Sequence, residues 1–178
     1  MRLIVATSSY PVNASEAVNA GVFVRDIVKQ LVEQGHDVRV FTPAKGEPIV
    51  ESPAPVTTFE WGGREKVLTR LRPSNPREIV GLARLMLSGR RALKRLARDT
   101  ETDAVIAMWA VPAGFWASGA KKPYAVWVLG SDIWKIGKYP LGRHLVRRVL
   151  RRAKHVFGNS YYLLDGVREL SGRSAEFL

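Results

Sequence analysis

Four stretches of this 178-residue chain combine small residues with polar side chains at points where a helix is expected to begin. They are residues 7–21, 109–113, 130–134 and 158–160. Backbone N–H groups exposed at the start of a helix bind anions such as phosphate, and the helix dipole strengthens the attraction. For any one stretch, the simpler explanation is an ordinary loop between a strand and a helix. Four such stretches at one edge of a sheet would favour a ligand-binding site. The candidate substrate-binding residues in these stretches are Gly21, Trp109, Gly130, Ser131, Asp132, Trp134, Asn159 and Ser160.

Side chains suited to acid–base or nucleophilic chemistry are few in these stretches. Asp132 is the one candidate catalytic residue, and the alternative is a turn residue that bonds its own backbone. His36, His144 and His155 do not cluster with one another or with a nucleophile. No G-x-G-x-x-G, G-x-x-x-x-G-K-S/T or G-x-S-x-G pattern occurs, so dinucleotide, P-loop and hydrolase sites lose their main support. The chain has no cysteine, which excludes disulfides and Cys-based metal sites, and we expect neither a metal nor another cofactor.

Apolar runs and helical patterns alternate along the chain. Strands are predicted at residues 3–6, 38–42, 56–61, 104–109, 124–129 and 155–157, and a seventh begins at 174–178. Helices are predicted between Gly21 and Gly35, from Pro76 through Leu96, and over 112–119, 141–153 and 161–170, with a loop at 64–75. This alternation is typical of an α/β fold, namely a three-layer, Rossmann-like, doubly wound and mostly parallel sheet of six or seven strands with helices on both faces. Residues 1–178 are then a single domain whose ligands bind outside the carboxyl ends of the strands.

Positive charge dominates the composition, with 28 Lys and Arg against 16 Asp and Glu and a net charge of +12. An excess of this size attracts anionic partners. The stretch 90–98 is one basic patch, and the densest patch consists of Arg143, Arg147, Arg148, Arg151, Arg152 and Lys154. Such a helix either exposes its arginines to water or holds the domain to an anionic membrane, since each basic residue near the lipid adds about 1 kcal/mol. Nucleic acid is not an expected partner, because these stretches lack interleaved aromatic residues.

No apolar run approaches the roughly 20 residues that span a bilayer. The charged residue Arg2 and the short apolar run after it do not form a signal peptide. We therefore expect a cytoplasmic protein, with peripheral contact at the inner face of the membrane if the basic patch binds lipid.

The order of several motifs resembles the glycosyltransferases of family four. That family commonly begins with a Pro-bearing loop, a glycine, an apolar helix and G-H-E-V, and here the corresponding segments are YP at 10–11, GVFVR at 21–25 and GHDV at 35–38. The later corresponding segments are AVIAMW at 104–109, VWVLGSDIW at 126–134 and RAKHVFGNS at 152–160. The resemblance covers nearly the whole chain, in the right order.

The resemblance implies a GT-B architecture, in which two Rossmann-like lobes face a cleft and the N-terminal lobe mainly shapes the acceptor site. This chain would correspond to that first lobe alone, with a C-terminal donor-binding domain as its partner, and it would be inactive by itself. The implied function is the transfer of a sugar from a nucleotide-activated donor to a glycan or lipid-linked acceptor, with retention of configuration.

Particular roles follow from the same resemblance. Gly21 would let the first loop approach the donor diphosphate, which a side chain would obstruct. Ser131 and Asp132 would bind acceptor hydroxyls, and Trp109 or Trp134 would offer a face to a sugar ring, unless each tryptophan simply packs in the core. The family commonly has a histidine where Leu129 stands, and leucine supplies neither a hydrogen bond nor a charge. The alternative function is a non-catalytic Rossmann-like binding module that docks on phospholipid or on a partner protein through its basic face.

Overall fold

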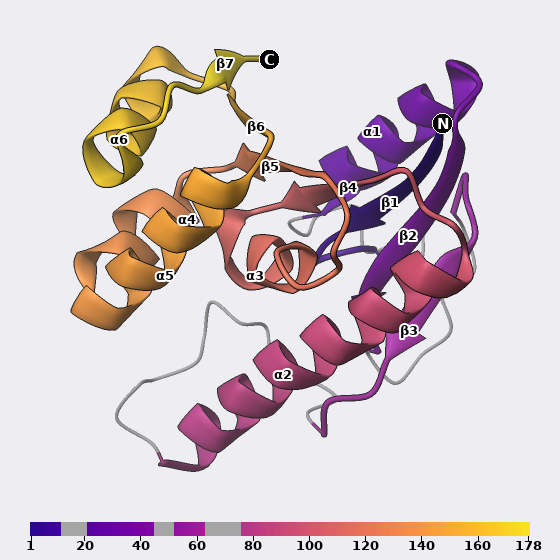
Figure 1. Cartoon of the computed structure of the whole chain (residues 1–178), viewed down its shortest axis with the longest axis horizontal. Coiled ribbons are helices and arrows are strands. Elements are labelled where there is room, and N and C mark those ends of the chain that lie inside the picture. The colour runs from indigo at the N-terminus through magenta and orange to yellow at the C-terminus, as the bar shows by residue number, and fades with distance from the viewer. Residues whose placement is uncertain (12–20, 45–51, 63–75) are drawn as a thin grey trace.

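The computed structural model describes residues 1–11, 21–44, 52–62 and 76–178, and in these the chain forms a seven-stranded sheet (Figure 1). All strand pairs are parallel, and the order across the sheet is β3-β2-β1-β4-β5-β6-β7. This arrangement confirms the predicted doubly wound α/β fold. The strands are β1 (Arg2–Ala6), β2 (Asp37–Pro43), β3 (Val56–Phe59), β4 (Ala104–Met108), β5 (Tyr124–Val128), β6 (His155–Gly158) and β7 (Glu176–Phe177).

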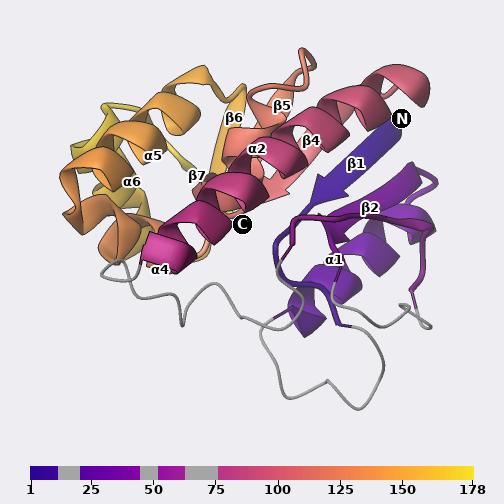
Figure 2. The same ribbon diagram turned by 90° about the horizontal axis from the view of Figure 1, so that it is seen from below.

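Helices lie on both faces of the sheet (Figures 1 and 2). From β1 to β3 the chain moves in one direction across the sheet, and from β3 through β4 to β7 it moves in the other. Right-handed crossovers therefore place α1 on one face, and α2, α3, α5 and α6 on the opposite face. The helices are α1 (Val22–Glu33), α2 (Pro76–Asp99), α3 (Phe115–Ala117), α4 (Ser131–Trp134), α5 (Pro140–Arg152) and α6 (Tyr161–Ser171), with short helical turns η3 (Ala110–Gly114) and η4 (Ile136–Lys138).

The structure corrects the sequence analysis in three places. The third strand ends at Phe59 and not at Trp61, and a short helix, α4, follows β5 where only a turn was predicted. The predicted helix 112–119 is found as η3 followed by α3 and ends earlier, at Ala117, while the extended residue Val111 lies just before it. Burial in α2 begins at Leu85. The predicted loop 64–75 lies outside the described residues.

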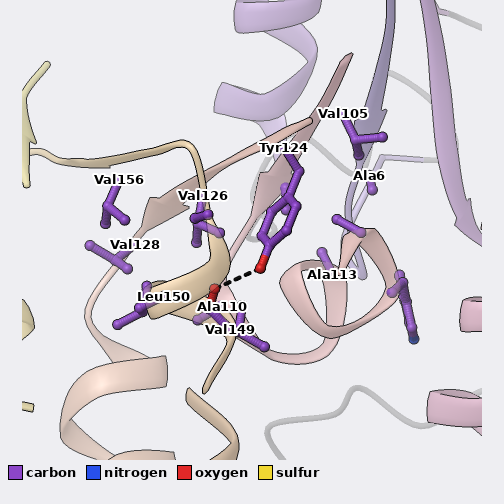
Figure 3. Close-up of a cluster of buried hydrophobic side chains, with 14 of the residues drawn as sticks. Ala6, Val105, Ala110, Ala113, Tyr124, Val126, Val128, Val149, Leu150 and Val156 are labelled. Carbon is purple, nitrogen blue, oxygen red and sulfur yellow. Dashed lines mark hydrogen bonds between the residues drawn. The ribbon is translucent and has the colours of Figure 1, made fainter. Parts of the chain in front are cut away.

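The larger core lies between the sheet and the face covered by α2, α3, α5 and α6 (Figure 3). Val126 and Val128 of β5 point toward Val149 and Leu150 of α5, and all four side chains are buried. Tyr124, at the start of β5, donates its phenolic O–H to the carbonyl of Val149 at 2.7 Å. Burial raises the pKa of the Tyr124 phenol from 10.0 to about 12, against smaller opposite effects from nearby arginines. This side chain therefore ties α5 to the sheet only while it is protonated.

Replacing Tyr124 with phenylalanine is expected to reduce the loss of stability at alkaline pH. The folded pKa of Tyr124 is raised, so its contribution is complete below the unfolded pKa of 10.0 and is lost as the pH rises towards about 12. Between about pH 9 and about pH 11.5, the wild-type free energy of unfolding should fall by about 2 kcal/mol more than that of Tyr124→Phe. Urea unfolding across this range measures the difference, and identical pH profiles would contradict it.

Candidate functional site

The four stretches singled out in the sequence follow β1, β4, β5 and β6, which are neighbours in the sheet. Because all strands are parallel, their carboxyl ends meet at one edge of the sheet, which we call the rim. The prediction that the four stretches share one edge is thus confirmed. The strand order reverses between β1 and β4, and in open α/β sheets this switch point is the usual position of a ligand site.

The first rim segment is held close to the start of α1. Thr7 is buried, and its hydroxyl donates to the carbonyl oxygen of Ser9 at 2.8 Å. Gly21 has a φ of 145°, and a Cβ at this position would lie 2.9 Å from the same carbonyl oxygen. Gly21 is therefore required here both by its backbone conformation and by the close approach of Ser9. Residues 12–20, which connect these two segments, lie outside the described residues.

Trp109 follows β4 at the rim with an unusual backbone conformation. Its φ is +73°, a value that costs a bulky non-glycine residue free energy and that clusters at functional sites. The half-buried Trp109 ring makes an edge-to-face contact with Phe23 of α1, with 5.8 Å between ring centroids. The predicted alternative of core packing therefore applies in part, because one side of the ring packs on α1 while the residue stays partly exposed. Sequence patterns gave no sign of this backbone conformation.

Asp132 is fully buried and joins two rim segments. Its Oδ2 accepts a hydrogen bond from the backbone N–H of Ala110 at 2.8 Å, and its Oδ1 accepts from Gly130 at 3.1 Å and from Leu129 at 3.4 Å. Burial raises the pKa of this carboxyl, although the backbone donors act in the opposite direction. The turn interpretation is confirmed, and the bond to Ala110 adds a link to the segment after β4. In this conformation Asp132 is a positioning residue whose oxygens face the backbone.

The remaining rim residues come from α4 and from the start of α6. Ser131 begins α4 and is partly exposed. The Trp134 ring stacks on Tyr162 with centroids 4.6 Å apart. Asn159 and Ser160 are exposed, and the hydroxyl of Ser160 accepts from the backbone N–H of Leu163 at 3.3 Å, which confirms the predicted helix cap.

Two exposed aromatic residues at the rim were missed in the sequence analysis. Tyr161 and Tyr162 follow the helix cap directly, and Tyr161 stacks on Phe177 with centroids 5.1 Å apart. The available signal was that two tyrosines occupy the first turn of a helix whose buried stripe begins only at Leu163. Together with Trp134 they give the rim above β5 to β7 an aromatic surface, which suits the flat faces of sugar rings.

A hollow of about 230 Å³ lies beside Trp134, between α4, η4, α5 and α6. It brings Trp134 close to Arg143, the first residue of the predicted basic patch, whereas the other members of that patch continue along α5 away from the hollow. Pockets for complete small-molecule ligands usually measure about 300–1,000 Å³, so this hollow would need a second wall to enclose a substrate. Its lining residues are Ile133, Trp134, Gly137, Lys138, Arg143, Gly166, Glu169 and Leu170.

Two negative findings apply to the described ranges. No group of three or more His, Asp or Glu side chains there is arranged to hold a metal ion. None of the described helices combines the length and the apolar character that crossing a membrane requires.

Solved structures of glycosyltransferases share this fold. Sucrose-phosphate synthase from Thermosynechococcus elongatus superposes with a TM-score of 0.71 at 13% identity, over 99% of this chain and 47% of that one. HepE of Anabaena, in complex with UDP and glucose, superposes with a TM-score of 0.61 at 15% identity, over 100% of this chain and 44% of that one. MurG of Acinetobacter baumannii superposes with a TM-score of 0.50 at 15% identity, over 88% of this chain and 40% of that one. The chain spans less than half the length of each.

Sequence comparison gives a consistent result. A search of curated proteins found no match. In contrast, the family model described as the glycosyl transferase 4-like domain matches residues 20–177, which include α1 and all the rim segments after it. On this evidence, the chain belongs to the glycosyl transferase 4-like domain family.

Proposed function

We propose that this chain is the acceptor-side half of a glycosyltransferase that uses a nucleotide-activated sugar. The observation that carries the proposal is the rim, where four segments distant in sequence meet beside the switch point of the sheet. Two constraints order these segments. Gly21 packs closely against Ser9 within the first segment, and the bonds from the backbone to Asp132 join the segments after β4 and β5. A preorganised rim of this kind positions polar groups for a reacting ligand without further ordering.

The rim residues are assigned different roles in binding the donor and the acceptor. The lack of a side chain at Gly21 lets Ser9 pack against the start of α1, and we propose that this helix N-terminus binds the donor diphosphate. The Ser131 hydroxyl is partly exposed and available to an acceptor hydroxyl, while Trp109 and Trp134 present ring surface to a sugar. Leu129 is partly buried against the cluster beneath α1, so we propose that backbone groups replace the histidine common in the family. Retention of configuration and the absence of a metal stay predictions.

We further propose that a second, donor-binding lobe closes over the rim. The structures of sucrose-phosphate synthase and HepE are more than twice as long as this chain, and the hollow beside Trp134 is too small to enclose a sugar nucleotide. The acceptor would be a glycan or a lipid-linked sugar, and the protein would act at the cytoplasmic side of the membrane. The chain alone should then transfer sugar poorly.

The proposal is tested with a longer form of the protein that includes a second lobe. Incubation with a panel of sugar nucleotides should show consumption of at least one donor when a suitable acceptor is present. Ser131→Ala should lower kcat/KM for the acceptor about tenfold, because it removes one hydrogen bond to an acceptor hydroxyl. Ser174→Ala, an exposed serine on the segment before β7, is the matched control and should leave kcat/KM unchanged.

Failure to consume any sugar nucleotide would contradict sugar transfer and favour the non-catalytic binding module. Equal kcat/KM values for Ser131→Ala and wild type would contradict the role given to Ser131 while leaving transfer itself in place.

A further inference from the structure

The whole net charge of the protein is concentrated on two segments. Residues 79–98 of α2 and residues 140–154, which include α5, contain twelve basic residues and no acidic residue. The chain has 28 basic and 16 acidic residues, so the rest of it is balanced with sixteen of each. The twelve residues are Arg84, Arg90, Arg91, Lys94, Arg95, Arg98, Arg143, Arg147, Arg148, Arg151, Arg152 and Lys154.

Both segments lie on the same face of the molecule, since α2 and α5 cover the same side of the sheet (Figure 2). Arg90 lies between them, where its Nη1 donates to the carbonyl of Phe115 and to the hydroxyl of Ser118, each at 2.9 Å. Partial burial, together with the charges of Arg152 and Arg148 on α5, lowers the pKa of Arg90. The positive charges of the two helices therefore approach one another beside α3 and form one surface, which we call the basic face.

Most of the basic face lacks internal counter-charges. In the part of the chain that the structure describes, the ion pair formed by these twelve residues is that of Arg98 with Asp99, at 3.0 Å. Like charges gathered without partners repel one another, so an external anionic surface would relieve an existing cost. The exposed members without an ion pair in the described residues are Arg84, Arg91, Lys94, Arg95, Arg143, Arg147, Arg148, Arg151, Arg152 and Lys154.

Exposed apolar side chains accompany the charge on α2. Ile79, Val80 and Leu87 are about half exposed, at 52%, 51% and 50%, and they lie in the first half of the same helix, on either side of Arg84. A helix that lies in a membrane interface combines exposed apolar side chains with Lys and Arg, as this helix does. Segments 79–98 and 141–154 contain no Phe, Tyr or Trp, so they offer no stacking surface to nucleic acid bases.

We infer that the basic face docks on an anionic lipid bilayer, with the apolar side chains of α2 entering the headgroup region. The basic residues of α2 and α5 then lie against the lipid phosphates. This inference does not depend on sugar transfer. A crossover helix runs antiparallel to the strands it connects, so α2 begins at the rim and brings its apolar turns to the same side of the molecule as the candidate site.

Vesicle binding tests the inference with a matched pair of lysines. Lys94 is exposed on α2, and Lys29 is exposed on α1, on the opposite face of the sheet. Lys94→Glu should weaken binding to phosphatidylcholine vesicles that contain phosphatidylglycerol by about 25-fold, since each unit of charge near an anionic surface is worth about fivefold. Lys29→Glu, which makes the same change in net charge, should weaken binding less than about twofold. Co-sedimentation with vesicles at several salt concentrations measures both.

A neutral substitution separates lipid from nucleic acid. Leu87→Gln keeps the charge, and it should weaken vesicle binding several-fold without changing the affinity for duplex DNA. Circular dichroism checks that each variant is folded. The inference is overturned if wild type does not bind the anionic vesicles, if the two lysine variants lose equal affinity, or if Leu87→Gln binds vesicles as wild type does.

Discussion

Replacing Asp132 with alanine is expected to lower the free energy of unfolding by about 4 kcal/mol, because buried N–H groups lose their acceptor. The two short bonds are those from Ala110 at 2.8 Å and from Gly130 at 3.1 Å. The Ala110 donor is buried and the Gly130 donor is partly buried, so the Ala110 N–H in particular would be left without a partner. Urea unfolding measures the stability, and hydrogen exchange should become faster at the amides of Ala110 and Gly130 in particular.

Two further variants separate this effect from the loss of a charge or of side-chain volume. Asp132→Asn keeps one acceptor oxygen but turns an NH₂ group toward the second backbone donor, so it should cost about 2 kcal/mol. Asp165→Ala removes an exposed carboxylate from α6, and its stability should remain within about 0.5 kcal/mol of wild type. An Asp132→Ala variant as stable as Asp165→Ala would show that the carboxylate does not hold the two rim segments together.

Replacing Gly21 with alanine is expected to destabilise the protein by about 3 kcal/mol, through backbone strain and a steric clash together. The φ of 145° suits glycine, and the new Cβ would lie 2.9 Å from the carbonyl oxygen of Ser9. This oxygen cannot easily move away, because it accepts the hydroxyl of the buried residue Thr7. Relief of the clash would displace the start of α1 from the rim, so sugar-nucleotide binding should weaken as well.

Gly35 provides the matched control for Gly21. It also has a positive φ, of 81°, but a Cβ at this position would meet no atom within 4 Å. Gly35→Ala should therefore show the backbone strain alone, at about 1 kcal/mol. Thermal and urea unfolding of both variants measure the difference. Equal losses of stability would mean that the contact between Gly21 and Ser9 does not constrain the rim.

Local sequence patterns were sufficient to predict most of the elements. The apolar runs of β1, β4 and β5 indicate buried strands, and the spacing of Val24 and Val28 indicates the buried side of α1. Both patterns depend only on residues that are neighbours along the chain. The common position of the four rim segments also followed from the sequence. Alternating strands and helices produce parallel crossovers, and these bring the carboxyl ends of all strands to one edge.

Other features required the tertiary structure, because their partners are distant in the chain. Asp132 accepts from Ala110, 22 residues away, and no motif distinguishes such an acceptor from a catalytic carboxylate. Trp134 meets Tyr162 only because α4 and α6 pack on the same face of the sheet.

The same distinction explains the basic face. The sequence by itself determined two basic, acid-free helical segments, the alternation of elements and the small-residue turns, since all of these are periodic or compositional properties. Only the tertiary structure decided that α2 and α5 share one side of the sheet, that Ile79 and Leu87 stay exposed there, and that Asp132 turns inward to the backbone. Whether a side chain is buried, and what it contacts, depends on which helices and strands pack against each other. The helical repeat in a sequence predicts one apolar stripe but does not show what will cover it.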